Sequence, residues 1–346
     1  MMPDTHSVIE GGYLRDILAQ PRALEDTLAG FELAETVRRL DEGRFRRIVL
    51  TGMGASYWAL HPLHLDLLQQ GRASFLLETS ELIHSLPAML NSHTLLIAVS
   101  QSGRSAETVR LLDVKAPDCF TLALTNTADS PLALRADVVV LTHAGEEFTV
   151  SCKTYVTALL ALKWVADSIA GRSLTRSRDE LSQAAPAVAA YLHNWREYVQ
   201  AAEAELTGAR HLFVLGRGAS LATAGIAGLI VKESAHFHAE GMSAAQFRHG
   251  PFEMVDRAVY ALVFAGDPTT ALLNARLVRD IVQAGGRASL AGEDAEPGIF
   301  RLPPVPASVR PIVEILPVQM ITLALAAMVG REAGKFERAS KVTITE

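Results

Sequence analysis

The sequence has few of the residues that build disulfide frameworks and metal sites. Its 346 residues include only two cysteines, Cys119 and Cys152, and these do not form a Cys-x-x-Cys motif or accompany a histidine cluster. A disulfide framework and a zinc site are therefore unsupported, and a reducing compartment is the simpler expectation. We expect no bound metal and no cofactor.

The chain also lacks an excess of positive charge. It carries 32 basic and 38 acidic residues, for a net charge of -6. A general nucleic-acid surface requires clustered lysine and arginine, so no nucleic-acid partner is expected. A phosphorylated small molecule remains compatible with this balance, because a single loop and a helix end suffice to hold a phosphate.

Long apolar runs and targeting features are absent as well. Residues 1–10 contain proline, aspartate, histidine and glutamate, unlike a secretory signal. The best apolar run, Thr157–Ile169, is interrupted by Lys163 and Asp167. We therefore expect no membrane-spanning segment and a cytoplasmic location.

Small aliphatic residues and an internal repeat dominate what is present. Hydrophobic residues make up 49% of the chain but aromatics only 6%, a composition typical of helices packed on parallel sheets. Arg47–Ser56 and His211–Ser220 each read as an apolar strand followed by Gly-x-Gly-Ala-Ser and a helix. The repeat and the length predict two similar α/β domains in tandem.

Further elements alternate along both halves. Buried strands are expected at Ser74–Leu77, Leu95–Val99, Thr121–Leu124, Val138–Leu141, Ala258–Phe264 and Arg287–Leu290, with a helix at Ala106–Leu112. The first forty residues and Leu174–Leu206 have a helical pattern, and Pro303–Pro311 is expected to be an extended loop. Strands alternating with helices predict parallel sheets with right-handed crossovers.

A dinucleotide-binding fold is the competing interpretation of the glycine turns. Its fingerprint requires a third glycine three residues after the second. Those positions hold Tyr57 and Leu221, so neither copy fits and a nicotinamide cofactor is disfavoured.

The most distinctive local motif lies after the predicted strand Leu95–Val99. Its polar members are Ser100, Gln101, Ser102 and Ser105, directly before a helix. Small hydroxyls, a glycine and free helix N–H groups form an anion cradle, and Ser56 from the first glycine turn is placed to assist. A serine-rich helix cap is the alternative, but one hydroxyl suffices for a cap, so three favour a phosphate site.

The second half concentrates acid and imidazole groups between Lys232 and Pro251. Glu233 and Glu240 are seven residues apart, which would place them on one side of a helix. A carboxylate in a partly dry pocket can move protons at neutral pH, and so can His249 in its Gly-Pro turn. An ion pair of Glu233 with Lys232 is the alternative.

Two other histidines of this segment, His236 and His238, do not suggest a metal site. On a helix, residues two apart point in different directions, and a helical zinc site needs a spacing of four. Each is equally explained as an ordinary core or surface residue.

Taken together, the motifs resemble the isomerase half of glucosamine-6-phosphate synthase, a member of the SIS (sugar isomerase) family. The match runs from about Leu40 to the C-terminus and rests on Gly54–Ser56, Ser100–Gly103, the region of Lys153, Lys232–Glu233, His238–Glu240, His249–Pro251 and the tail Ser340–Glu346. The resemblance implies two tandem SIS domains, each a parallel sheet flanked by helices, in a homodimer with shared active sites. The implied boundaries are a helical segment 1–38, SIS domain 39–173, helical linker 174–206, SIS domain 207–336 and a tail 337–346 that closes the active site.

The resemblance also implies roles for individual residues. The phosphate of the sugar would be held by Ser56, Ser100, Gln101, Ser102 and Ser105. Glu233 would shuttle the proton between C1 and C2, and His249, reaching into the partner subunit's site, would open the ring. Glu240 would contact a substrate hydroxyl, Val150 and Ser151 would approach the sugar by their backbone, and Ser340 and Lys341 would contact the substrate from the tail.

Departures from the synthase pattern narrow the expected reaction. The sequence shows no glutaminase domain, the Schiff-base lysine position holds Ser340 with Lys341 shifted by one, and a second lysine position holds Ile230. We therefore expect not glutamine-driven synthesis but an amino-sugar-phosphate deaminase or isomerase. It would convert glucosamine 6-phosphate to fructose 6-phosphate and ammonia, as SIS-type glucosamine-6-phosphate deaminases do.

Two alternatives remain open. Arg104 and Gln246 replace acidic residues of the synthase pattern, so the sugar contacts have changed and the substrate could be galactosamine 6-phosphate or a fructosamine 6-phosphate. A non-catalytic phosphosugar sensor is the other, although retention of both Glu233 and His249 favours catalysis.

Overall fold

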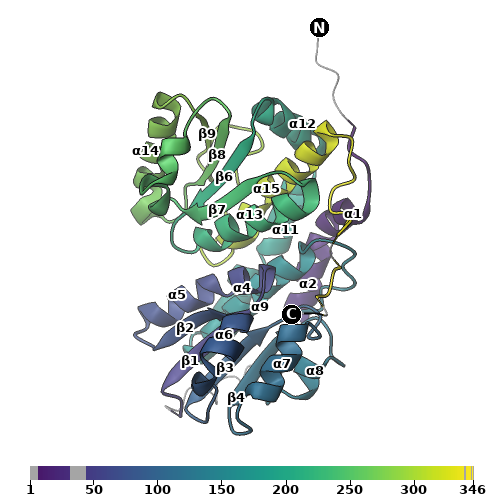
Figure 1. Ribbon diagram of the computed structural model, residues 1–346, viewed down its shortest axis with the longest axis vertical. Helices are drawn as coiled ribbons and strands as arrows, with labels where there is room; N and C mark the ends of the chain where they lie inside the picture. Colours follow the sequence, from purple (N-terminus) through teal and green to yellow (C-terminus); the bar gives the residue numbers. More distant parts are fainter. Residues whose placement is uncertain (1–6, 32–43, 339, 344, 346) are drawn as a thin grey trace. The chain divides into compact units, whose positions relative to one another are not determined.

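The computed structural model describes residues 7–31, 44–338, 340–343 and 345. The chain forms two compact units, each built from separate segments (Figure 1). The N-sheet unit consists of residues 22–147, 153–182 and 338–346, and the C-sheet unit of residues 1–21, 148–152 and 183–337. The predicted linker 174–206 is thus divided between the two units, and the tail belongs to the N-sheet unit. The predicted start of the first SIS domain lies outside the described residues.

The N-sheet unit is built on a five-stranded parallel sheet of order β2-β1-β3-β4-β5. Its strands are β1 (Arg47–Gly52), β2 (Ser74–Glu78), β3 (Thr94–Val99), β4 (Phe120–Thr125) and β5 (Val138–Leu141). β3 is buried along its whole length, as expected for a central strand covered on both faces. This sheet confirms the expected α/β architecture.

Helices cover both faces of this sheet. A core of aliphatic side chains joins one face to α6 (Thr79–Ser85), α7 (Ala106–Val114) and α8 (Pro131–Leu134). α4 (Ala55–Ala59) and α5 (His61–Gln69) contact β1 and β2 and pack against α9 (Lys153–Ile169). α9 is buried at sixteen of its seventeen positions, which explains its apolar composition.

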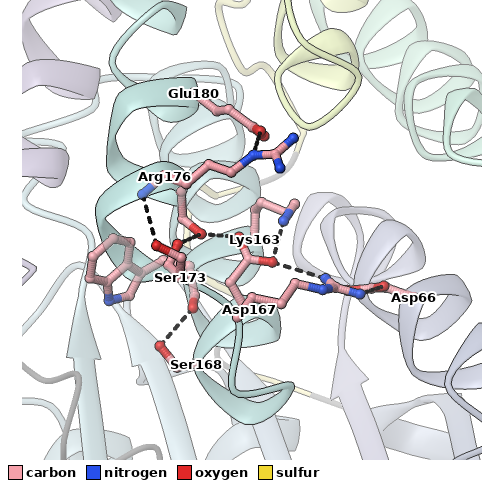
Figure 2. Close-up of polar contacts among 10 residues, drawn as sticks. Asp66, Lys163, Asp167, Ser168, Ser173, Arg176 and Glu180 are labelled. Atoms are coloured by element: carbon pink, nitrogen blue, oxygen red, sulfur yellow. Dashed lines mark hydrogen bonds and ion pairs between the residues drawn. The ribbon is translucent and has the colours of Figure 1, made fainter.

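A buried carboxylate joins α9 to the next helix, α10 (Leu174–Leu181) (Figure 2). Asp167, whose side chain is 3% exposed, pairs with Lys163 and Arg172 and accepts a hydrogen bond from Ser177 at 2.7 Å. Arg172 also binds both oxygens of Asp66 on α5 at 2.6 Å. A buried charge is tolerated only when it is paired, so these contacts hold α5, α9 and α10 in one arrangement.

The C-sheet unit has a four-stranded parallel sheet of order β7-β6-β8-β9. The strands are β6 (His211–Gly216), β7 (Ala239–Ser243), β8 (Val259–Phe264) and β9 (Arg287–Ala291). α14 (Pro268–Gln283) packs on one face together with the short η3 helix (Gln246–Arg248). α13 (Ser220–Ala235) contacts β6 and β7. α15 (Arg310–Met328) packs against α13 and also contacts α11 (Ala184–Leu192) and α12 (Trp195–Leu206).

α15 corrects the expectation that no apolar run is long enough to cross a membrane. It has 19 residues with a mean hydropathy of 1.8, which is sufficient by length and composition alone. In the described part of the chain it is the one such helix, and 94% of its apolar window is buried inside the protein. Its composition is therefore that of a central core helix.

Most predicted elements occur within one or two residues of their expected ends, but the segment 232–240 does not. It was expected to be helical, whereas α13 ends at Ala235 and His236 adopts a left-handed conformation with φ 52°. The chain then enters β7, so Glu240 lies on a strand and Glu233 on a helix. His236 and His238 likewise do not share a helix. At the other end, the extended stretch that begins at Pro303 ends before Arg310, because Pro311 lies in the first turn of α15.

The contact between α13 and β7 is made backbone to backbone. A Cβ atom on Gly241 would lie 1.7 Å from the Ala224 carbonyl oxygen, and one on Gly228 would lie 2.5 Å from the Gly241 nitrogen. Glycine at both positions therefore allows the helix that carries Glu233 to approach the strand.

We expect Gly241→Ala to destabilise the C-sheet unit by about 3 kcal/mol or more, since overpacking against backbone cannot relax by a rotamer change. Gly12→Ala is the matched control. Its added methyl would meet only the Phe148 and Thr149 side chains at 3.1 Å and 3.2 Å, so its loss should be clearly smaller. Thermal and urea unfolding of both variants give the comparison, and equal stability of Gly241→Ala and wild type would contradict the packing argument.

Candidate active site

The serine loop, residues 100–105, connects β3 to α7 at the carboxyl edge of the N-sheet. Each of its three serine hydroxyls accepts a backbone N–H: Gly103 N donates to Ser100 Oγ at 3.1 Å, Arg104 N to Ser102 Oγ at 3.2 Å and Thr108 N to Ser105 Oγ at 3.4 Å. Ser105 is the N-cap of α7, so the cap interpretation is correct for this residue. A hydroxyl that accepts a hydrogen bond can still donate its own proton, so the loop geometry is compatible with an anion cradle.

Gly103 allows this loop to fold tightly against the next connection. Its φ is 61°, and a Cβ atom there would lie 2.2 Å from Ser130 Oγ. Both the conformation and the close approach require glycine. The loop is therefore shaped by its own sequence and by Ser130.

A cavity of about 960 Å³ opens beside the serine loop, within the N-sheet unit. Of the predicted phosphate contacts, Gln101 and Ser102 line this cavity, and Lys341 reaches it from the tail. Ser100 and Ser105 belong to the same loop but are not among the lining residues. Ser56 lies in α4, after β1, the strand adjacent to β3.

The sequence reasoning missed the polar residues that follow β4 and β5. Asn126, Thr127, His143, Glu146 and Glu147 also line the cavity. They were detectable, because parallel strands present their carboxyl ends at one edge and ligands bind in open α/β sheets at that edge. The residues after the last two predicted strands were therefore site candidates as well.

Asn126 organises the connection that follows β5. Its Oδ1 accepts from Ala144 N at 2.8 Å and from Thr142 Oγ1 at 3.1 Å, while its Nδ2 donates to the Gly145 carbonyl at 2.8 Å. These three bonds hold His143 in a left-handed conformation with φ 47°, which is unusual for a residue with a side chain. Such strain is typical of positions whose side chain must face a site.

Glu147 anchors the C-terminal tail to the cavity. Its buried carboxylate accepts from Thr154 N at 3.0 Å, from Thr154 Oγ1 at 2.7 Å and from Lys341 Nζ at 3.2 Å. Farther along, the Thr343 carbonyl accepts from Ala106 N at 3.0 Å, at the first turn of α7. Ser340 donates its hydroxyl proton to the Val342 carbonyl at 2.7 Å, which leaves the hydroxyl oxygen able to accept.

In the C-sheet unit, Glu233 lies near the end of α13. Burial raises the pKa of Glu233 to about 7, with the neighbouring Lys232 opposing this shift. Among the described residues, no side chain forms a hydrogen bond or salt bridge with its carboxylate, so the alternative of an ion pair with Lys232 is not observed. An acid of this kind exchanges a proton readily at neutral pH.

Glu240 and His249 are more exposed than Glu233. Glu240 lies on β7, 3.9 Å from His238 Nε2. His249 lies between η3 and η4 (Pro251–Met254), where Gly250 with φ 126° turns the chain, as its Gly-Pro sequence predicts. Val150 is buried and Ser151 half-buried, just before α9. In the described part of the chain, no three metal-ligating side chains cluster.

Comparison with known proteins identifies the architecture. The family model described as SIS domain matches residues 44–166 and 205–291, more than half of the chain. The glutamine–fructose-6-phosphate aminotransferase (isomerizing) of Pyrococcus horikoshii is 29% identical over 97% of this chain and 59% of its own length. That of Thermococcus kodakarensis is 30% identical over 96% of this chain and 58% of its own length. The chain thus spans less than two thirds of the length of each of these relatives.

A solved structure shows the same fold. Glucosamine-6-phosphate deaminase from Thermotoga maritima superposes with a TM-score of 0.81 at 18% identity, covering 97% of this chain and all of that one. At this identity the likeness concerns the fold alone.

We expect Glu147→Gln to release the tail, because it removes the charge that binds Lys341. Trypsin cleavage at Lys341 should accelerate about tenfold, which corresponds to roughly 1.4 kcal/mol of local opening free energy. Glu146→Gln is the matched control, since that side chain is exposed and only its backbone carbonyl accepts from Lys153. Mass spectrometry of timed digests measures the rate, and equal rates in both variants would contradict the anchoring role.

Proposed function

We propose, since the chain belongs to the SIS domain family, that it is an enzyme acting on a phosphorylated amino sugar. The proposed reaction converts glucosamine 6-phosphate to fructose 6-phosphate and ammonia. The observation that carries the proposal is Glu233, a carboxyl group whose pKa burial raises to about 7. A carboxyl group whose pKa is near 7 suits a proton transfer at neutral pH.

The comparisons support this substrate class. The matched relatives are named for an aminotransferase of fructose 6-phosphate, and a structural neighbour is named a glucosamine-6-phosphate deaminase. The cavity of the N-sheet unit adds a physical argument. It combines the serine loop with the exposed Glu146, which suits a ligand that carries both a phosphate and an ammonium group, while Asp26 in the same lining is paired with Arg22.

In the proposed mechanism, the phosphate anchors the substrate and the sugar end reacts. Donors of the serine loop, with Ser56, hold the phosphate, which orients the reacting carbons at a distance. His249 exchanges a proton with the ring oxygen and the C1 hydroxyl, giving the open-chain aldehyde. Glu240, the Val150–Ser151 backbone, Ser340 and Lys341 contact the sugar.

Glu233 then takes the proton from C2 and returns it to C1. The C2–H electrons form a C1–C2 double bond as the aldehyde oxygen gains a proton. Protonation at C1 leaves an imine at C2. Water adds to this imine and ammonia leaves, so that the products are fructose 6-phosphate and ammonia. Because the pKa of Glu233 is close to 7, both the base and the acid form are populated at neutral pH, as a shuttle requires.

We also propose that the protein acts as a cytoplasmic homodimer. The side chain of His249 is exposed within one chain, and among the described residues none forms a hydrogen bond or ion pair with it. This suits a residue that completes the site of a second copy. Light scattering tests the proposal, and a fully active monomer would contradict it.

Replacement of Glu233 tests the reaction directly. We expect Glu233→Gln to lower the release of ammonia and fructose 6-phosphate by about 10²- to 10⁴-fold, the range typical of a lost general acid or base. Affinity for glucosamine 6-phosphate, measured by calorimetry, should change little. Glu253→Gln, at an exposed position of η4, is the control and should retain activity. Binding by wild-type protein without turnover would instead indicate a sensor, and no binding would indicate a different phosphosugar.

The pH profile gives an independent check. Abstraction of the C2 proton needs ionised Glu233, so kcat/KM should rise with pH as the group loses its proton near pH 7. Stability should show the opposite trend. The folded pKa lies above the ordinary value of 4.5, so the folded state binds more protons between about pH 4.5 and 7 and loses stability as pH rises through that range. Glu233→Gln should weaken this trend, and an unchanged stability profile would contradict the raised pKa.

A further inference from the structure

The C-sheet unit contains a second cavity, of about 480 Å³, at the carboxyl edge of its own sheet. The order β7-β6-β8-β9 repeats the order β2-β1-β3-β4, so β8 corresponds to β3 and β9 to β4. The second cavity is lined by Ala265–Gly266 after β8 and by Gly292–Ala295 after β9. It is therefore the topological counterpart of the serine-loop cavity.

The chemistry of this counterpart is not that of a phosphate site. After β8 the chain has no run of serines, and Asp267 is the N-cap of α14, where its carboxylate accepts from Thr269 N at 2.9 Å. A carboxylate at the helix start occupies the place that an anion would take. Duplication of the fold has thus left a cavity with a different lining.

A buried carboxylate faces this cavity from α15. Glu314 is 1% exposed, lines the cavity and accepts from Ser220 Oγ at 2.7 Å and from Thr223 Oγ1 at 3.4 Å. A carboxylate has about four acceptor positions, so these two bonds leave capacity for a donor in the cavity. Ser220 ends the second Gly-x-Gly-Ala-Ser repeat and corresponds to Ser56 in the first.

A guanidinium lines the same cavity one helical turn earlier. Arg310 and Glu314 are four residues apart on α15, yet no salt bridge joins them. Arg310 influences the pKa values of both Glu314 and Asp267 through its charge, so it lies near both carboxylates without contacting either. Within the described ranges, no residue forms a hydrogen bond or ion pair with this guanidinium. The cavity lining therefore offers one cationic side chain, that of Arg310, and three carboxyl groups, those of Glu314, Glu293 and Asp294, with Glu314 one turn from Arg310 on the same helix.

The remaining walls are mostly apolar. Those that surround the charged pair are Ala271, Leu272, Ala275, Leu302, Pro303 and Val313. A cavity of a few hundred cubic ångströms with mostly apolar walls and a few charged groups has the features of a small-molecule site.

We propose that this cavity binds a free α-amino acid with an apolar side chain. The carboxylate of the ligand pairs with Arg310, its ammonium group donates to Glu314, and its side chain packs against α14 and the 302–303 stretch. A planar guanidinium binds a carboxylate through two parallel hydrogen bonds, and the ligand completes the charge pair that the helix itself leaves open. The site lies within the C-sheet unit and does not depend on the proposed sugar reaction.

Calorimetry on the full chain, with L-leucine and L-phenylalanine as probes, tests the site. We expect at least one of them to bind. L-Leucinamide, which lacks the carboxylate, and N-acetyl-L-leucine, which lacks the ammonium group, should each bind at least about tenfold more weakly than L-leucine, as should the matching analogues of L-phenylalanine. Absence of binding by both amino acids, or equal binding of the blocked analogues, would overturn the proposal.

Three variants locate the site. Arg310→Gln should weaken amino-acid binding at least about tenfold, and so should Glu314→Gln. The latter keeps an acceptor for Ser220, and burial already raises the pKa of Glu314 to about 7, so a neutral side chain suits its surroundings. Arg276→Gln, exposed on α14 and outside the lining, should bind as wild type.

If Glu314→Gln does not fold, Arg310→Gln alone decides the outcome. If the Arg310→Gln variant binds the amino-acid probe as tightly as the wild type does, the proposal is contradicted. Binding of inorganic phosphate in preference to the amino acids, lost in Arg310→Gln, would contradict it as well and would indicate an anion site instead.

Discussion

Burial of parallel strands on both faces is the constraint on which the rest of this structure depends. β3 and β8 are buried at every position, so neither strand can carry an exposed polar side chain within its length. Next to these two strands, polar chemistry is therefore found in the connections at their carboxyl edges. The serine loop, the residues after β4 and β5 and the second cavity all lie where this constraint leaves room for them.

Duplication of the unit did not duplicate its chemistry. The four strands of the second sheet repeat the order of the first four strands of the five-stranded sheet, and both glycine turns allow a helix to begin close to the sheet. The connections that follow β3 and β8 can differ in sequence because each needs only a turn and a helix cap. Ser105 is the cap in the N-sheet unit, and Asp267 is the cap in the C-sheet unit. A serine cap leaves a neutral cradle for an anion, whereas an aspartate cap fills it with a carboxylate. The residue type at the cap is thus one difference between the ligand classes that we propose for the two cavities.

Buried Asp167 and half-buried Glu233 differ in how their charge is compensated. Asp167 is surrounded by Lys163, Arg172 and Ser177, which compensate its desolvation and make it part of the framework. Glu233 has a raised pKa and no comparable set of partners among the described residues. Its burial costs stability once it ionises, which is the arrangement expected of a group kept for proton transfer.

Helices and strands whose apolar residues recur at a regular spacing were predictable from the sequence. The two strand–turn–helix repeats, six further strands and the serine loop occur where local apolar patterns and glycines indicated. The segment 232–240 was not predictable in this way. Its helix ends at His236 in a left-handed conformation, and only pairing with β6 makes Ala239–Ser243 a strand. Local pattern cannot represent that pairing, because its partner lies more than twenty residues away.

The sequence by itself determined the α/β class and the duplication, and it indicated the candidate acid–base residues. The tertiary structure decided which of these residues share a site. It brought Asn126, His143 and Glu147 beside the serine loop, bound Lys341 to Glu147 and left Arg310 and Glu314 unpaired with each other. The physical reason is that burial, and with it the pKa of Glu233, depends on packing between segments distant along the chain, whereas strand and helix formation depends largely on neighbours.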